Sequence, residues 1–191
     1  MTGEIDIDLL GKIMKEGAKR VKSVKRVPEI IKEDEFKALI AGVKKPHHRL
    51  AYILGFYQCM RVSEVVNLLP GNVHLDRNII EIRLGKGGKD RNIPISPELK
   101  ACRGFLKLLP LKCGIRALEI AFKKDCLRIL NKNLHFHTLR HSGATHYLNV
   151  KKWNLRQVQI FLGHSRLDTT EIYTHVNPED LMNAMWGGEK Q

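Results

Sequence analysis

The chain has 191 residues, of which 43% are hydrophobic, enough for a sizeable core and more in keeping with one domain plus extensions than with two domains. Lysine and arginine number 33 against 20 aspartate and glutamate, a net charge of +13, which indicates a polyanionic partner such as nucleic acid, although a merely soluble basic protein has the same balance. No apolar stretch approaches the roughly 20 residues of a membrane span, and the polar, acidic start is unlike a secretory signal, so we expect a cytoplasmic protein with no membrane partner.

Cysteine usage indicates neither a zinc site nor a disulfide framework. The four cysteines lie far apart in the chain, and no two of them form a C-x-x-C pair. We therefore expect reduced thiols, most of them in the core: Cys59, Cys102, Cys113 and Cys126.

The first 27 residues differ in pattern from the rest, because basic side chains alternate with apolar ones until Pro28 interrupts. One interpretation is a solvated surface helix or a disordered arm. The other is a basic linker that follows DNA phosphates through side chains such as Lys22, Lys25 and Arg26.

A globular pattern begins after Pro28. Acidic residues follow Lys32 directly, where they suit the positive end of a helix dipole and predict a helix start. A long apolar run over 51–69 predicts a further helix, which Pro70 ends.

Three short β-type runs follow, over 73–75, 79–84 and 92–96. The glycine-rich segment 85–90 is typical of a hairpin connection between the last two. Everything after Pro97 has the pattern of helices with short breaks. The expected fold class is α+β, mainly α-helical with one small three-stranded antiparallel sheet.

The segment 162–175 combines a helix break with polar chemistry. Gly163 ends a helix predicted over 154–162, and a capping-box pattern from Asp168 begins a new short one. Tyr173 then falls in the second turn of this new helix, while His164 lies in the break. The turn between them lets the two side chains converge, which one straight helix would not.

Further candidates lie earlier in the chain. His137 and Arg140 are three residues apart, which places them on one face of a helix. Arg61 interrupts the apolar helical run, and Lys86 and Lys89 lie at the tip of the hairpin. Phosphodiester transfer needs this kind of set, because arginine forks match the non-bridging oxygens and the reaction needs a nucleophile, a base and an acid.

Each of these residues also has an ordinary interpretation. A helical tyrosine is usually a packed core residue, a lone arginine is usually an ion-pair partner, and His164 could simply cap a helix. His135, His137 and His141 could ligate zinc, since a pair four apart on a helix is a known spacing. However, no cysteine or carboxylate in that stretch completes the ligand set, and the neighbouring arginine would repel a cation.

Four stretches together carry a specific resemblance: 60–64, 85–91, 137–141 and 162–173. In this order, and with a tyrosine nine residues after the histidine of L-G-H-S, the sequence resembles the tyrosine recombinase (phage integrase) family, in particular its short Xer-like members. The resemblance covers roughly residues 28–180 and implies the catalytic-domain fold of that family.

The resemblance also implies roles for individual residues. It assigns six of them to strand cleavage. Arg61 and Arg140 would bind the scissile phosphate, and His164 would form a hydrogen bond to one of its non-bridging oxygens. Tyr173 would attack to form a 3′-phosphotyrosyl link, while Lys86 would protonate the leaving 5′ oxygen and His137 would assist proton transfer. Glu64 would orient the neighbouring catalytic side chains without contacting the substrate itself. Lys86 is preferred over Lys89 because it occupies the G-K-G position of the family. The link conserves bond energy, so neither a metal, ATP nor any other cofactor is expected.

The predicted partner is double-stranded DNA, with further phosphate contacts from Lys89 and Arg91 and from the basic arm. We divide the chain into an arm over 1–27, a catalytic domain over 28–177 and a C-terminal tail over 178–191. The resemblance implies a homotetramer on DNA in which the tail docks on a neighbouring subunit, and the alternative is packing on its own domain.

The family usually carries an N-terminal helical domain that clamps the other face of the DNA, and no segment here has that length. Two rival functions remain open. One is a non-catalytic DNA-binding protein that acts as an architectural factor or an inhibitor, and the other is a type IB topoisomerase, whose chemistry is the same.

Overall fold

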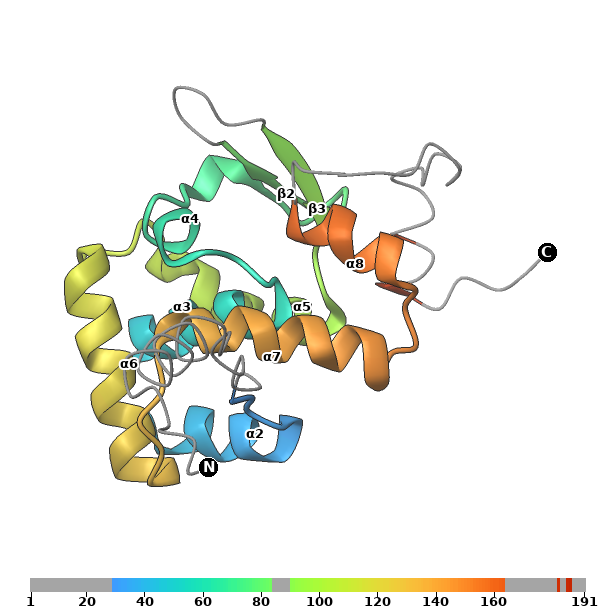
Figure 1. Cartoon of the computed structure of the whole chain (residues 1–191). Helices are drawn as coiled ribbons and strands as arrows, with labels where there is room; N and C mark the ends of the chain where they lie inside the picture. Colours follow the sequence, from blue (N-terminus) through green and yellow to red (C-terminus); the bar gives the residue numbers. More distant parts are fainter. Residues whose placement is uncertain (1–28, 84–89, 164–181, 183–184, 187–191) are drawn as a thin grey trace, which may run out of the picture.

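The computed structural model describes residues 29–83, 90–163, 182 and 185–186 (Figure 1). The described helices are α2 (Glu33–Gly42), α3 (Pro46–Tyr57), α4 (Val62–Val66), α5 (Pro97–Ala101), α6 (Ile115–Leu130), α7 (Phe136–Asn149) and α8 (Leu155–Leu162), with 3-10 turns η1 (Pro70–Asn72) and η2 (Arg103–Leu108). The described strands are β1 (Val73–His74), β2 (Ile79–Ile82) and β3 (Arg91–Pro94). The predicted fold class, mainly helical with one small sheet, is confirmed.

The sheet is antiparallel in the order β1-β2-β3, as the three β-type runs predict. Ile80 of β2 lies opposite Ile93 of β3, and both are buried, whereas Glu81 lies opposite the exposed Asn92. This alternation is the period-two pattern of a sheet with one face on the core. The glycine-rich connection 84–89 lies outside the described residues.

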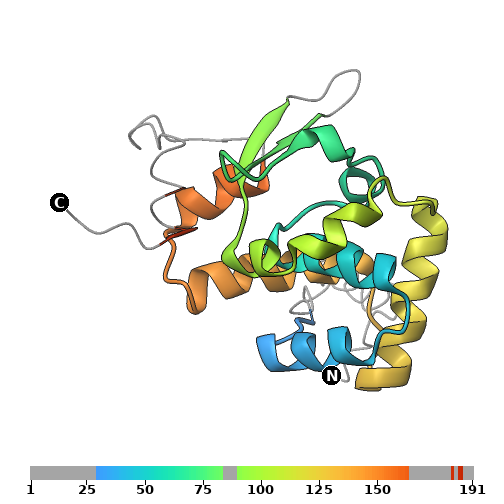
Figure 2. The ribbon, with the colours of Figure 1, turned by 180° about the vertical axis from the view of Figure 1, so that it is seen from behind.

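The two helices at the centre, α3 and α7, pack at close range because each contributes a glycine. A Cβ atom on Gly143 would overlap the carbonyl oxygen of Phe56, and one on Gly55 would lie 2.9 Å from the Leu139 side chain. Viewed from behind, the sheet lies at one end of the molecule and α2 at the other, with α3 and α7 between them (Figure 2). This pair therefore forms the centre on which the other described helices pack.

The prediction of one long helix over 51–69 is wrong. Helix α3 ends at Tyr57, Cys59 adopts a left-handed backbone conformation with φ of 50°, and α4 begins only at Val62. The new helix starts there because Glu64 accepts a hydrogen bond from the backbone N–H of Arg61, with 2.8 Å between the nitrogen and the carboxylate oxygen. Arg61 is thus the N-cap residue of a short helix.

The other predicted helix boundaries in the described residues are confirmed. Helix α2 begins after Lys32 with three acidic residues in its first turn. Helix α8 begins after Asn154, whose side chain caps it, and ends at Gly163, which has a φ of 65°. All four cysteines are free thiols, and Cys59 and Cys126 are buried. Within the described residues, every helix is too short or too polar to traverse a lipid bilayer.

Candidate active site

Arg140 bonds to the backbone at two helix ends that lie far apart in the sequence. It lies early in α7 with only 3% of its surface exposed. Its Nη1 donates to the carbonyl oxygen of Cys59 at 2.7 Å, and its Nη2 donates to that of Leu162 at 2.6 Å. Burial, with the nearby positive charge of Arg61, lowers the pKa of Arg140 to about 10, so the guanidinium stays charged at neutral pH.

Glu64 is the buried counter-ion of this region, with 1% of its side chain exposed. It accepts two bonds from Arg91, from Nη1 at 2.8 Å and from Nη2 at 3.0 Å, and one from Nη1 of Arg61 at 2.9 Å. Its Oε2 lies 3.9 Å from Nη1 of Arg140. Burial alone would raise the pKa of this carboxyl, but the hydrogen bonds and charges of Arg91 and Arg61 outweigh burial and lower it.

The cluster therefore carries excess positive charge, because three guanidinium groups surround one carboxylate. Arg61 is its most accessible member, with 37% of its side chain exposed against 12% for Arg91 and 4% for Arg140. Guanidinium forks match the oxygens of a phosphate. The arrangement can thus bind a phosphate at Arg61, with the buried Arg140 and Arg91 adding positive charge beside it.

His137 lies in the first turn of α7, three residues before Arg140. It is exposed, and its ring lies edge-on to that of His141 with 4.5 Å between centroids. The alternative use of these histidines as metal ligands finds no support in the described residues, because no group of three histidine, cysteine or carboxylate side chains is placed to hold an ion.

The remaining residues that the resemblance assigns to cleavage lie outside the described residues: Lys86, His164 and Tyr173, together with Lys89, Lys22, Lys25 and Arg26. The structure does describe where their segments begin. Segment 84–89 joins the paired strands β2 and β3, and His164 directly follows Gly163, whose helix end is held through the bond from Arg140 to Leu162. The described residues next to both segments therefore lie near the arginine cluster.

Arg91, which the sequence predicts as a DNA contact, is paired with Glu64 in the structure. Both its terminal nitrogens bind Glu64, and its aliphatic stem lies against Gly163, where an added Cβ would come within 2.5 Å of Cδ. No local pattern signals this pairing, since the two partners are 27 residues apart. The carbonyl groups of Cys59 and Leu162 were missed for a similar reason, because backbone acceptors leave no mark in a sequence.

The described part of the C-terminal tail packs on its own domain. Met185 is buried, and its sulfur lies 3.7 Å from the Tyr147 hydroxyl oxygen. The ammonium of Lys100 lies 4.6 Å from the centre of the Trp186 ring. In the single chain, these two tail residues thus dock in cis.

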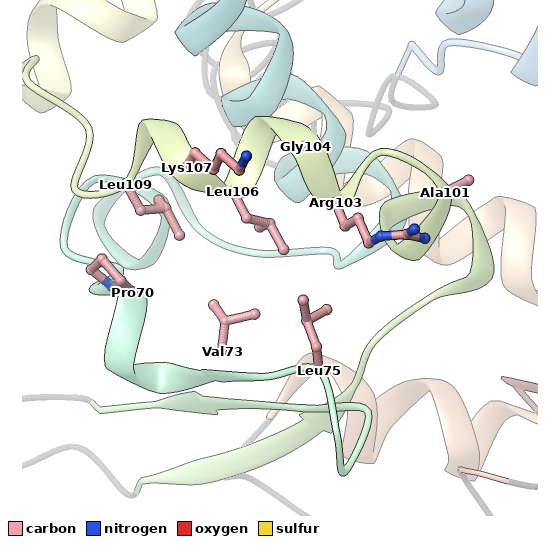
Figure 3. Close-up of a pocket in the computed structure, with 9 residues that line it drawn as sticks. All are labelled: Pro70, Val73, Leu75, Ala101, Arg103, Gly104, Leu106, Lys107 and Leu109. Atoms are coloured by element: carbon pink, nitrogen blue, oxygen red, sulfur yellow. The ribbon is translucent and has the colours of Figure 1, made fainter.

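A cavity of about 700 Å³ lies apart from the arginine cluster, between β1 and η2 (Figure 3). Leu106 and Leu109 face Val73 and Leu75 across it, and Arg103 lies at its edge. None of the four charged residues of the cluster lines this cavity, so we treat it as separate from the candidate site.

Comparison with known proteins identifies the family. The profile described as "Phage integrase family" matches residues 29–110 and 115–180, which is most of the chain. The chain belongs to the phage integrase family. Within it, the chain is similar to "Tyrosine recombinase XerA" of Pyrococcus furiosus (strain ATCC 43587 / DSM 3638 / JCM 8422 / Vc1), with 34% identity over 84% of this chain and 62% of the relative.

Solved structures of the family agree with this fold. The crystal structure of XerA recombinase aligns with a TM-score of 0.65 at 29% identity, over 83% of this chain and 64% of that one. A lambda integrase tetramer bound to a Holliday junction aligns with a TM-score of 0.59 at 16% identity, over 87% of this chain and 58% of that one, and shows the fold alone. The chain thus spans somewhat less than two thirds of the length of these relatives.

Proposed function

We propose that this member of the phage integrase family is a site-specific DNA recombinase that cleaves and rejoins strands through a 3′-phosphotyrosyl intermediate on Tyr173. The observation that carries the proposal is the arginine cluster. Arg61 and Arg140 lie beside one buried carboxylate, where excess positive charge is held in place before any substrate arrives. Such preorganised charge stabilises a phosphorane without reorganisation during the reaction.

The choice of Tyr173 is supported by what the other tyrosines do. The chain has four. Tyr52 donates a hydrogen bond to Asp125, and Tyr147 donates one to the backbone carbonyl of Tyr57. Burial raises the pKa of the hydroxyls of Tyr52, Tyr57 and Tyr147. All three are buried. A nucleophile must reach the phosphate and lose its proton readily, so Tyr173 is the tyrosine left for the reaction.

In the proposed reaction, the Tyr173 oxygen forms a bond to phosphorus while the bond from phosphorus to the 5′ oxygen breaks. Arg61 and Arg140 stabilise the charge on the non-bridging oxygens, His164 bonds one of those oxygens, and His137 assists removal of the tyrosine proton. Lys86 supplies the proton that the 5′ oxygen needs. Religation reverses these steps and consumes no ATP, since the phosphotyrosyl bond keeps the energy of the broken one.

The proposed substrate is duplex DNA, bound by a tetramer of this chain. The net charge of +13 suits a polyanion, and the lambda integrase neighbour is described as a tetramer on a Holliday junction. We propose that the basic arm over 1–27 and Lys89 add phosphate contacts. On assembly, the tail over 178–191 would exchange its cis contact at Tyr147 for the same surface of a neighbouring subunit. Such an enzyme works where DNA is, at the nucleoid in the cytoplasm.

The test is incubation with a duplex nicked beside the scissile phosphate, so that cleavage releases a short fragment and traps the covalent complex. We expect a protein–DNA species that survives denaturation with wild-type protein and is absent with Tyr173→Phe. Tyr52→Phe is the matched control, because it removes a hydroxyl that binds only Asp125 among the described residues. Binding without covalent capture by the wild type would instead favour a non-catalytic DNA-binding protein.

A further inference from the structure

The Arg91 side chain is largely buried and is fixed by two hydrogen bonds within the protein. Arg91 is the first residue of β3, and only 12% of its side chain is exposed. Its Nη1 and Nη2 donate to the two oxygens of Glu64 at 2.8 Å and 3.0 Å. Two parallel bonds between planar groups fix the plane of the carboxylate as well as its position.

The same two oxygens also bind Arg61. Oε1 of Glu64 accepts from Nη1 of Arg61 at 2.9 Å, and Oε2 accepts from its backbone N–H at 2.8 Å. Any rotation of the Glu64 carboxylate therefore moves the Arg61 guanidinium or breaks the N-terminal cap of α4. The orientation of Arg61 depends in this way on the partner that fixes Glu64.

We propose that Arg91 is a positioning residue, which keeps Arg61 directed toward the substrate by satisfying Glu64 and makes no DNA contact of its own. This inference rests on the proposed recombinase function. A buried carboxylate that loses its charged partner is strongly destabilised, so other nearby donors are favoured to replace that partner. With Arg91 in place, Arg61 gives Glu64 a single side-chain bond and remains 37% exposed. Without it, Arg61 would turn inward to form the fork itself.

Arg91 also reaches the segment that leads to the nucleophile. Its stem lies beneath Gly163, where an added Cβ would come within 2.5 Å of Cδ and 2.7 Å of Nε. Gly163 immediately precedes His164 in the sequence. One side chain thus links the sheet, the cap of α4 and the end of α8.

The experiment measures cleavage of two nicked substrates by full-length protein. One has an ordinary scissile phosphate. The other has a methylphosphonate at that position, a neutral linkage that offers no negative charge for an arginine to match. On the ordinary substrate, both Arg91→Gln and Arg91→Lys should slow cleavage by about 10²-fold, because lysine keeps the charge and loses the fork. On the methylphosphonate, the loss should shrink to a few-fold.

Arg83→Gln is the matched control. It removes the same charge from the residue that directly follows β2, where the side chain is 72% exposed and pairs with Glu81. This variant should cleave like the wild type. The salt dependence of DNA binding should have the same slope for Arg91→Gln as for wild type, and thermal melting of each variant checks its folding.

Three outcomes would overturn the inference while leaving the proposed function in place. A salt slope lowered by about 0.9 in Arg91→Gln, with near-normal cleavage by Arg91→Lys, would make Arg91 a phosphate contact. Equal losses on both substrates would make its role merely structural. Unimpaired cleavage by both variants would give it no role. Absence of any covalent species with the wild type would remove the proposed function itself, and the inference with it.

Discussion

Nη2 of Arg140 donates to the carbonyl oxygen of Leu162 at 2.6 Å, so a residue at the start of α7 holds the last residue of α8. Arg140→Ala should leave this carbonyl and that of Cys59 without their donor. Charged hydrogen bonds of this kind contribute about 1.5–3 kcal/mol each, so we expect a loss of at least about 2 kcal/mol in unfolding free energy, together with loss of cleavage. Urea unfolding and the nicked-substrate assay measure the two effects.

Arg128→Ala is the control for this prediction. Arg128 also donates to a backbone carbonyl, that of Gly42, but its side chain is 50% exposed. Water can replace this bond, so the variant should lose less than about 1 kcal/mol and should cleave normally. An Arg140→Ala protein as stable as Arg128→Ala would show that the two carbonyl bonds do not hold the helix ends.

Gly163 is required for two separate reasons. Its φ of 65° lies in the left-handed region, and an added Cβ would approach the stem of Arg91. Gly163→Ala should therefore cost more than about 1 kcal/mol in unfolding free energy. Gly104→Ala is the comparison, because nothing lies within 4 Å of the Cβ it would add. Similar stability of the two variants in chemical unfolding would contradict the assignment.

The buried His146 should make stability depend on pH. It packs against the rings of Phe56, Tyr57 and Tyr147, and burial is the main reason that its pKa is lowered, against the opposing charge of Glu33. The unfolded chain then binds the proton more readily than the folded chain. Stability is fully present above the unfolded pKa of about 6.5 and is lost as pH falls below it.

Unfolding free energies at pH 7.5 and about 5 measure this effect. His146→Phe, which fits an aromatic environment and cannot titrate, should lose less stability over that interval than the wild type does. Replacement of the exposed His141 by glutamine should leave the wild-type pH dependence in place. If His146→Phe showed the full pH dependence, the titration would have to lie elsewhere.

Lys86 is predicted to protonate the leaving 5′ oxygen, which should contribute about 10²–10⁴-fold to the cleavage rate. Lys86→Ala should cleave ordinary DNA slowly and recover most of its rate when sulfur replaces the bridging 5′ oxygen, since a thiolate leaves without a proton. Arg140→Ala should show no such recovery, because its proposed contact is to a non-bridging oxygen. Rescue of Lys89→Ala in place of Lys86→Ala would mean that the acid is Lys89.

Local patterns predicted the parts of the fold that depend on local forces. The three strands follow from short β-type runs, and the start of α2 and the end of α8 follow from an acidic first turn and a helix-ending glycine. These signals act within a few residues, so the sequence displays them directly.

The break between α3 and α4 could not be predicted in the same way. The residues on both sides of it are largely apolar and suggest one helix, yet Cys59 adopts a left-handed conformation. Its carbonyl oxygen accepts a bond from Arg140, 81 residues away. The pairing of Arg91 with Glu64 likewise depends on tertiary structure. Glu64 three residues after Arg61 was the one available hint, since an acidic residue at that position often caps a helix.

The two anchors of Arg140 have a consequence for how such a site changes over evolutionary time. Every residue carries a main-chain carbonyl, so substitutions at positions 59 and 162 can alter the side chains and leave both acceptors in place. The geometry is then inherited through backbone shape more than through residue identity. Homologues with dissimilar residues at these two positions can therefore hold the arginine through the same two carbonyl groups. A sequence alignment would not reveal this similarity, whereas a superposition of main-chain atoms would.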